Sequence, residues 1–302
     1  MAALESAREQ QAAQRGLVAL MLQDLAGTWS SLNPGRLGQT LPKWIAAVAA
    51  ILDRYGDAAG ALGLDYYEAE RDAARVAGRA PTPEIRTPER AQVESSLRWA
   101  TKGLWDDHVL EPDPEFDRLW QQILDEEAAA DLAGLDEEDL ADIGDDLLDQ
   151  PDEPAEPAVQ RLSPAADRLA KARTQVDGVA TRLVTDVGRG AVLDAVAEDR
   201  KAVGVARVAA PNACAFCRTM TLRGAVYKNE QTAGRRANAK FTEGSGEFKY
   251  HNHCRCWTAP LFEGEEWEPQ PEVAKWQEQY DRAKAMRGDT LKNFYRILRA
   301  GE

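Results

Sequence analysis

The chain has few side chains that bind metals through sulfur or imidazole, and it lacks a long apolar run. Its 302 residues include only four cysteines and three histidines. The longest apolar run, WIAAVAAIL at 44–52, is far shorter than the roughly 20 residues that a transmembrane helix needs. The N-terminal residues 1–16 carry acidic side chains and no apolar core, so they do not predict a signal peptide. We therefore expect a protein of a reducing cytoplasm, where cysteines bind metals or act in catalysis more often than they form disulfides.

Basic residues are absent from one segment. Residues 125–157 contain fifteen Asp or Glu and no Lys or Arg, so the rest of the chain carries +1 although the whole carries −14. Residues 158–256 have seventeen basic and nine acidic side chains, which leaves non-specific DNA contact open despite the net charge. Three prolines at the end of the acidic segment interrupt any helix there. We predict a flexible tether, with an acidic interaction segment as the alternative.

Helical composition dominates the N-terminal part. Residues 7–26 and 41–75 are rich in Ala, Leu, Glu and Arg, and a third helical segment ends near KGLW. Thr40 and Pro42 are the candidate cap and first turn of the second helix. We expect a helical module over 1–124 whose tryptophans pack in an ordinary core.

A long helix is predicted over 164–200, with Ser163 as its cap and Pro164 in its first turn. Apolar side chains recur along it at seven-residue intervals, with others between them: Leu162, Leu169, Ala172, Val176, Val179, Leu183 and Val187. Such a seam packs against a partner helix, either from this chain or from a second copy. Over 211–262, glycines and β-branched residues predict short strands and loops, among them MTLRGAVY, FTEGSGEFKY and CRCWTAPLF.

Two amphipathic helices are predicted within 271–300. The first has one apolar face, made by Val273, Trp276, Tyr280 and Ala283. The second has another, made by Leu291, Phe294, Tyr295 and Leu298. The predicted fold class is therefore mainly α. A helical N-terminal module (1–124) is joined by an acidic, Pro-rich linker (125–160) to a C-terminal module (161–302), which consists of the long helix, a small α+β Cys/His knuckle and the C-terminal helix pair.

The cysteines are concentrated in one window. All four, with two of the three histidines, lie in the 43 residues from Cys214 to Cys256. Cys214 and Cys217 place two sulfurs on one tight turn, the usual first half of a tetrahedral zinc site. The second half must come from YHNHCRC. In an extended strand Cys254 and Cys256 point to one face, whereas in a tight turn His251 and Cys254 converge, and the sequence leaves both pairs open.

A bound metal competes with two other interpretations of this window. Its thiolates would be offset by basic neighbours, namely Arg218, Arg223, Lys249 and Arg255. Two disulfides would be the alternative crosslink for a small domain with little core. A Cys–His hydrolase needs one activated cysteine in a pocket, so a cluster of four favours ligation, and we expect no enzymatic activity.

The window resembles a known family. ACAFCRTMTLRGAVYKNEQTA (213–233) and YHNHCRCWTAPLF (250–262) closely resemble the signature of phage Mu F-like minor head proteins, in particular the head morphogenesis proteins of actinobacterial tailed phages and prophages. The likeness extends to SLRWATKGLW, RGAVLDAVAEDRKAVGVARV and KNFYRILRAG, and so covers most of the chain except its acidic middle. By position, the family's motif falls on Cys214, Cys217, His251, Cys254 and Cys256, while His253 matches only some members.

The resemblance implies a structural virion component, present in few copies inside the phage head near the portal and in the host cytoplasm during assembly. The implied partners are the portal protein and the major capsid protein, and the implied role is in head assembly and DNA packaging or ejection. Contact with packaged double-stranded DNA would be non-specific and salt-dependent. We expect no membrane contact, and a homo-oligomer remains open. The alternative is a metal-dependent or thiol enzyme acting on nucleic acid or the cell wall.

Overall fold

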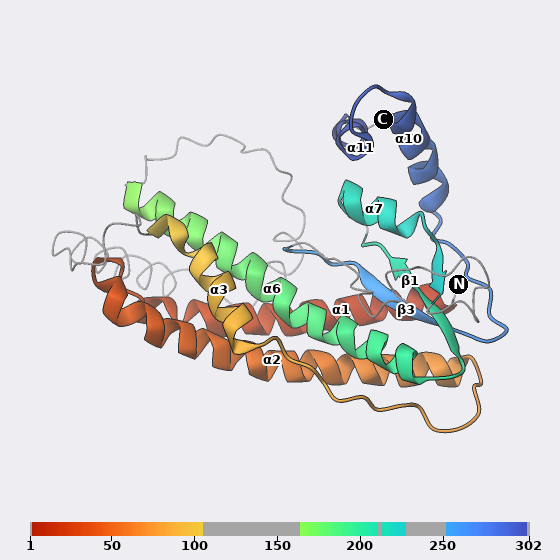
Figure 1. Cartoon of the computed structure of the whole chain (residues 1–302), viewed down its shortest axis with the longest axis horizontal. Coiled ribbons are helices and arrows are strands. Elements are labelled where there is room, and N and C mark those ends of the chain that lie inside the picture. Colours follow the sequence, from red (N-terminus) through yellow and green to blue (C-terminus); the bar gives the residue numbers. More distant parts are fainter. Residues whose placement is uncertain (1, 105–163, 211–212, 228–251, 301–302) are drawn as a thin grey trace, which may run out of the picture. The chain divides into compact units, whose positions relative to one another are not determined.

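The computed structural model describes residues 2–104, 164–210, 213–227 and 252–300 (Figure 1). The acidic linker, the FTEGSGEFKY segment and His251 lie outside these residues. The chain forms two compact units, each made of segments that are separate in the sequence. Unit 1 comprises Met1–Val18, Asp53–Pro88 and Thr181–Glu302, and unit 2 comprises Ala19–Leu52 and Glu89–Ala180. The predicted division into N-terminal module, linker and C-terminal module stays a prediction.

The described residues are mainly helical, as the sequence predicts, and include one three-stranded sheet. The helices are α1 (Ala2–Ala26), α2 (Leu37–Ala73), α3 (Arg90–Ala100), α6 (Pro164–Glu198), α7 (Ala215–Thr221), α10 (Val273–Ala285) and α11 (Thr290–Arg299). The strands are β1 (Ala202–Val208), β2 (Ala225–Tyr227) and β3 (Trp257–Phe262). Within this part of the chain, every helix is too short or too polar to span a bilayer.

Helix α6 confirms the long helix predicted over 164–200. The described members of its seam are all buried: Leu169, Ala172, Val176, Val179, Leu183 and Val187. Helix α2, in contrast, begins earlier than predicted, because a short 3-10 helix (Pro34–Arg36) leads directly into it. Pro42 therefore lies inside the helix, and Thr40 is not its cap. The Thr40 hydroxyl instead donates to the carbonyl of Asn33 at 3.1 Å.

Unit 2 has a tryptophan pair in its core. The rings of Trp29 and Trp44 lie 5.1 Å apart and are both buried. The indole N–H of Trp44 donates to the Thr28 hydroxyl at 3.1 Å, so this buried polar atom has a partner. The expectation that tryptophans of the N-terminal part are core residues is correct for this pair and wrong for Trp99, which is 59% exposed on α3.

The sheet of unit 1 has the order β2-β1-β3, and both pairings are antiparallel. Its central strand β1 was not predicted, because Ala, Val and Gly continue the composition of the preceding helix. The register pairs Val208 with Trp257, and Pro260 falls on the edge strand β3, where a missing N–H is tolerated. Part of the predicted MTLRGAVY strand is helical instead, because Met220 and Thr221 belong to α7.

The core of unit 1 joins this sheet to helices. Tyr66 and Tyr67 of α2 pack with Val192 and Val196 of α6, with β1, and with Trp257 and Phe262 of β3. The prediction for the last helix was half right. Phe294 is buried, but Leu291 and Tyr295 are 39% and 43% exposed, and Ile297 takes their place in the core.

A buried carboxylate fixes the junction between α6 and β1. Asp199 accepts hydrogen bonds from the Arg71 guanidinium at 2.8 Å and from the Tyr67 hydroxyl at 2.9 Å. Its other oxygen accepts from the backbone N–H of Lys201 at 2.8 Å. Burial alone would raise the pKa of Asp199, but the Lys201 N–H, Arg71 and Tyr67 outweigh it and lower the pKa below its usual value. The ionised form of Asp199 therefore stabilises the fold.

Helices α2 and α6 approach each other at two glycines. A Cβ atom on Gly188 would lie 2.7 Å from the carbonyl oxygen of Ala59, and one on Gly63 would lie 2.4 Å from the carbonyl oxygen of Gly188. Both distances are too short for a real Cβ contact, and the atoms met are backbone atoms that cannot rotate away. Glycine is therefore required where these backbones meet.

The contact between α2 and α6 can be tested with two glycines of α6. We expect Gly188→Ala to destabilise the protein by about 1–3 kcal/mol or more, because the added methyl group overpacks a backbone contact. Gly190→Ala is the matched control, since a Cβ there meets nothing within 4 Å. It should be neutral or stabilising by up to about 1 kcal/mol through helix propensity. Urea unfolding measures both, and equal effects of the two substitutions would contradict the close approach.

The Asp199 junction predicts a pH dependence. Asp199→Asn should cost about 3–5 kcal/mol at pH 7, because it leaves the Arg71 guanidinium buried without its charge partner. Since the pKa of Asp199 is lowered in the folded state, its contribution is complete above the unfolded pKa of about 3.9 and is lost as pH falls through the folded value. The difference between wild type and variant should therefore shrink below about pH 4. Glu263→Gln, in an exposed ion pair with Lys201, is the control and should cost less than about 1 kcal/mol.

A candidate metal centre of three buried cysteines

The first two cysteines lie at the start of α7. Cys214 is the N-cap residue, and its sulfur accepts a hydrogen bond from the backbone N–H of Cys217 at 3.5 Å. An N-cap side chain normally satisfies one of the free N–H groups of the first helical turn. Here a thiol occupies that position, so the two sulfurs of the CAFC motif lie on one turn. Cys217 is fully buried and Cys214 is half-buried.

The other two cysteines immediately precede β3. Cys254 and Cys256 are both buried, whereas Arg255 between them is only half-buried. This alternation is that of extended chain, in which residues two apart share a face. His253 is exposed and has a positive φ of 59°, which marks the turn before the extended segment.

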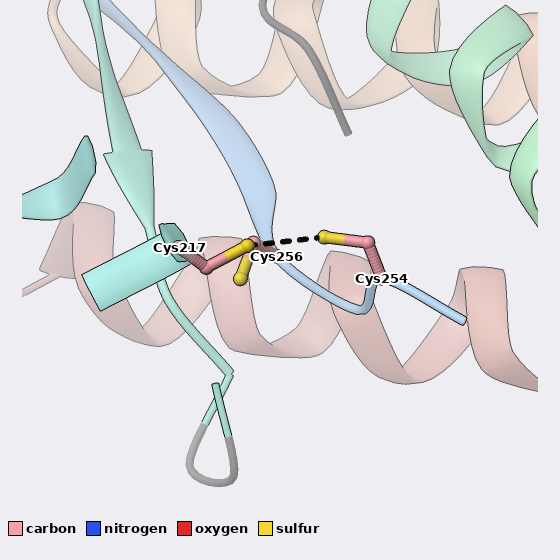
Figure 2. Close-up of side chains that lie close together, drawn as sticks. All are labelled: Cys217, Cys254 and Cys256. Atoms are coloured by element: carbon pink, nitrogen blue, oxygen red, sulfur yellow. Dashed lines mark hydrogen bonds between the residues drawn. The ribbon is translucent and has the colours of Figure 1, made fainter. Parts of the chain in front are cut away.

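Three sulfurs converge (Figure 2). Those of Cys217, Cys254 and Cys256 all lie within 4.8 Å of one another, and those of Cys217 and Cys254 are 3.4 Å apart. In a tetrahedral site with Zn–S bonds of about 2.3 Å, neighbouring sulfurs are separated by about 3.8 Å. None of the four cysteines, all of which lie in the described part of the chain, forms a disulfide. The buried trio therefore has the spacing and the chemistry to bind a metal ion.

The five side chains predicted to bind a metal do not all have the same outcome in the structure. Cys217, Cys254 and Cys256 are brought together, and Cys214 packs at the edge of the same cluster. His251 lies outside the described residues. Of the two pairs that the sequence left open for the second half of the site, Cys254 and Cys256 both lie in the cluster.

Two buried arginines contact the cluster, and neither was predicted from the sequence. Arg207 on β1 is 2% exposed and directs its guanidinium to the sulfur of Cys217, with 3.7 Å between nitrogen and sulfur. Arg189 on α6 is 1% exposed and donates to the carbonyl oxygen of Cys254 at 2.6 Å. It also donates to the Cys256 carbonyl at 2.7 and 3.0 Å. Its remaining nitrogen pairs with Asp186 at 2.8 Å, so one side chain fixes the backbone at two cysteines.

The predicted basic neighbours have mixed outcomes. Arg218 interacts electrostatically with Cys214 and Cys256, and its guanidinium lies 5.2 Å from the Trp276 ring. Arg223 is exposed, and Lys249 lies outside the described residues. Arg189 and Arg207 were missed because they precede the cysteine window in the sequence, and only the pairing of β1 with β3 and the packing of α6 bring them to it. The one signal for Arg207 in the sequence was a single arginine within an otherwise apolar segment, AVGVARV.

The pKa values of two thiols of the cluster, Cys217 and Cys256, are raised. Hydrogen bonds with Cys214, Cys254 and Cys256, together with burial, raise the pKa of Cys217. For Cys256, the hydrogen bond with Cys217 lowers the pKa, but the hydrogen bond with Cys254 and burial outweigh it and raise the pKa to about 12. Thiolate formation at neutral pH therefore requires a metal ion that displaces the protons.

An apolar shell surrounds the sulfurs. Trp276 of α10 and Phe294 and Ile297 of α11 form one buried cluster with Cys217, Cys254 and Cys256. The rings of Phe294 and Tyr280 meet edge-on at 5.4 Å. The C-terminal helix pair thus packs on the cysteine cluster, and a crosslink there would connect α7 to the start of β3 beneath this pair.

Comparison with known proteins identifies a family. Among curated proteins and among solved structures, none matches the chain. A family model described as "VG15 protein" matches residues 1–131 and 148–283, which is most of the chain. The gap between the two matched ranges falls inside the acidic segment 125–157, and the second range contains the whole cysteine window. The chain belongs to the VG15 family, a family of phage virion-associated proteins.

Proposed function

We propose that this VG15 protein is a structural minor head protein of the Mu F-like type. In this proposal it lies inside the phage head near the portal, contacts the portal protein and the major capsid protein, and assists head assembly and DNA packaging or ejection. The observation that carries the proposal is membership of a phage virion-associated family. The Mu F-like signature around the cysteines supports the finer assignment.

We further propose that the cysteine centre holds a structural zinc ion and that the protein is not an enzyme. Thiolate ligands favour zinc, copper(I) or iron–sulfur clusters over hard cations. A catalytic zinc site keeps one position open to water or substrate, whereas a structural site is closed. The sulfurs of Cys217, Cys254 and Cys256 belong to side chains that are at most 2% exposed and are packed against aromatic rings. Such burial supports a role in holding the fold together.

The head assignment can be tested in the phage or prophage that encodes the chain. Purified heads should contain the protein in few copies per particle by quantitative mass spectrometry. Particles made without it should be fewer or should package less DNA, measured by electron microscopy and by the DNA content of the particles. A complementing copy of the gene should restore both. Absence of the protein from washed heads, with normal packaging in the deletion strain, would refute the assignment.

The zinc assignment predicts a defined stoichiometry. Protein purified under reducing conditions should contain about one zinc ion per chain by elemental analysis. Chelation should lower the melting temperature, because an ion that binds only the folded state stabilises it by mass action. Cys256→Ser should remove the zinc, and His253→Ala, at an exposed position beside the cluster, should retain it. A stable, metal-free protein with one hyper-reactive thiol would instead favour a thiol enzyme.

A further inference from the structure

Three sulfurs leave a tetrahedral ion one ligand short. Among the described residues, Cys214 is the side chain best placed to supply it. Its sulfur lies on the same helical turn as Cys217, is hydrogen-bonded to the Cys217 N–H, and interacts with the Cys217 thiol. Cys214 also packs against the apolar cluster that contains the other three cysteines. Its sulfur is not one of the three that lie within 4.8 Å of one another, so it would have to move toward an ion held by them.

The second observation is electrostatic. Four thiolates around a divalent ion carry a formal charge of −2, whereas three thiolates and a neutral histidine carry −1. A buried charge is costly unless opposite charges lie beside it. Arg207 donates to the Cys217 sulfur and is almost completely buried. Arg218 interacts electrostatically with Cys214 and Cys256, so a second guanidinium group adds positive charge near the cluster.

Arg189 has a different role from these two arginines. It contacts the carbonyl oxygens of Cys254 and Cys256 and not their sulfurs, and Asp186 pairs with it. The charge of Arg189 is thus largely balanced by Asp186. Among the described residues, Arg207 and Arg218 both interact with cysteines of the cluster, and two cations beside it favour the more negatively charged ligand set.

From these two observations we infer that Cys214 is the fourth ligand. The centre is then a four-cysteine site formed by Cys214, Cys217, Cys254 and Cys256, and the buried guanidinium of Arg207 is an outer-shell group that offsets part of its negative charge. The inference rests on the zinc site proposed above. It assigns no ligand role to His251.

The ligand set can be measured by zinc competition and cobalt substitution. Cys214→Ser should lower zinc affinity by more than roughly 100-fold, beyond the loss expected for an outer-shell partner. The sulfur-to-cobalt charge-transfer absorption should fall by about a quarter, because one of four thiolates is lost. Cys214→His keeps a zinc ligand and should recover much of the affinity with the same reduced absorption, which separates ligand loss from misfolding. His251→Ala should change neither readout.

Arg207 is tested in the same assays. Arg207→Gln should lower zinc affinity by about 10–100-fold, as other outer-shell substitutions do, and leave the number of cobalt-bound thiolates unchanged. Arg223→Gln is the matched control, because Arg223 is exposed just after α7 and should have no effect. If His251→Ala removes a ligand while Cys214→Ser does not, the four-cysteine assignment is wrong and the zinc site stands. If the wild type binds neither zinc nor cobalt, the zinc proposal itself fails, and the head assignment is still tested by its own experiment.

Discussion

Burial of three cysteine sulfurs beside guanidinium groups is the constraint on which the C-terminal part of unit 1 depends. Among the described residues the sheet has three short strands of seven, three and six residues, and its stability depends on packing against helices. The cluster connects its two longer strands, because Cys217 follows β1 and Cys256 precedes β3. Helices α10 and α11 add an apolar cover through Trp276 and Phe294. The cysteine cluster thus adds to the core that the sheet shares with α2 and α6.

The long helix α6 supports the same centre. Arg189 carries its guanidinium from α6 to the carbonyl groups of Cys254 and Cys256, and Asp186, one turn earlier, neutralises it. Gly188, the residue before Arg189, is where α6 touches the backbone of α2. A shift of the helix at this glycine would therefore move the arginine that holds the cysteine backbone. The packing of α6 on α2 and the geometry of the cysteine centre are therefore coupled through two adjacent residues, Gly188 and Arg189.

Most of the correct predictions came from the periodicity of apolar residues and from the spacing of the cysteines. The seven-residue repeat of α6 predicted both its length and its buried side chains, because helix burial is periodic along the chain. Strand β1 was missed since its small residues do not alternate in polarity. The exposed face of α11 was assigned wrongly for a related reason. Tyr295 and Phe294 are both aromatic, and only the tertiary contact with Tyr280 selects Phe294 for the core.

At the candidate site, too, features set by neighbouring residues were predictable from the sequence, and features set by distant residues were not. The cysteines are visible in the sequence because metal-ligand spacing is a local property of turns and strands. Arg189 and Arg207 are not, since charge neutralisation of a buried site depends on which distant residues the fold delivers to it. An arginine in a buried strand is costly unless it has specific partners, and a sulfur atom is one partner of Arg207. A thiol that keeps its proton needs no such cation, whereas a metal-bound thiolate does. The position of Arg207 therefore supports the metal-bound cluster proposed above.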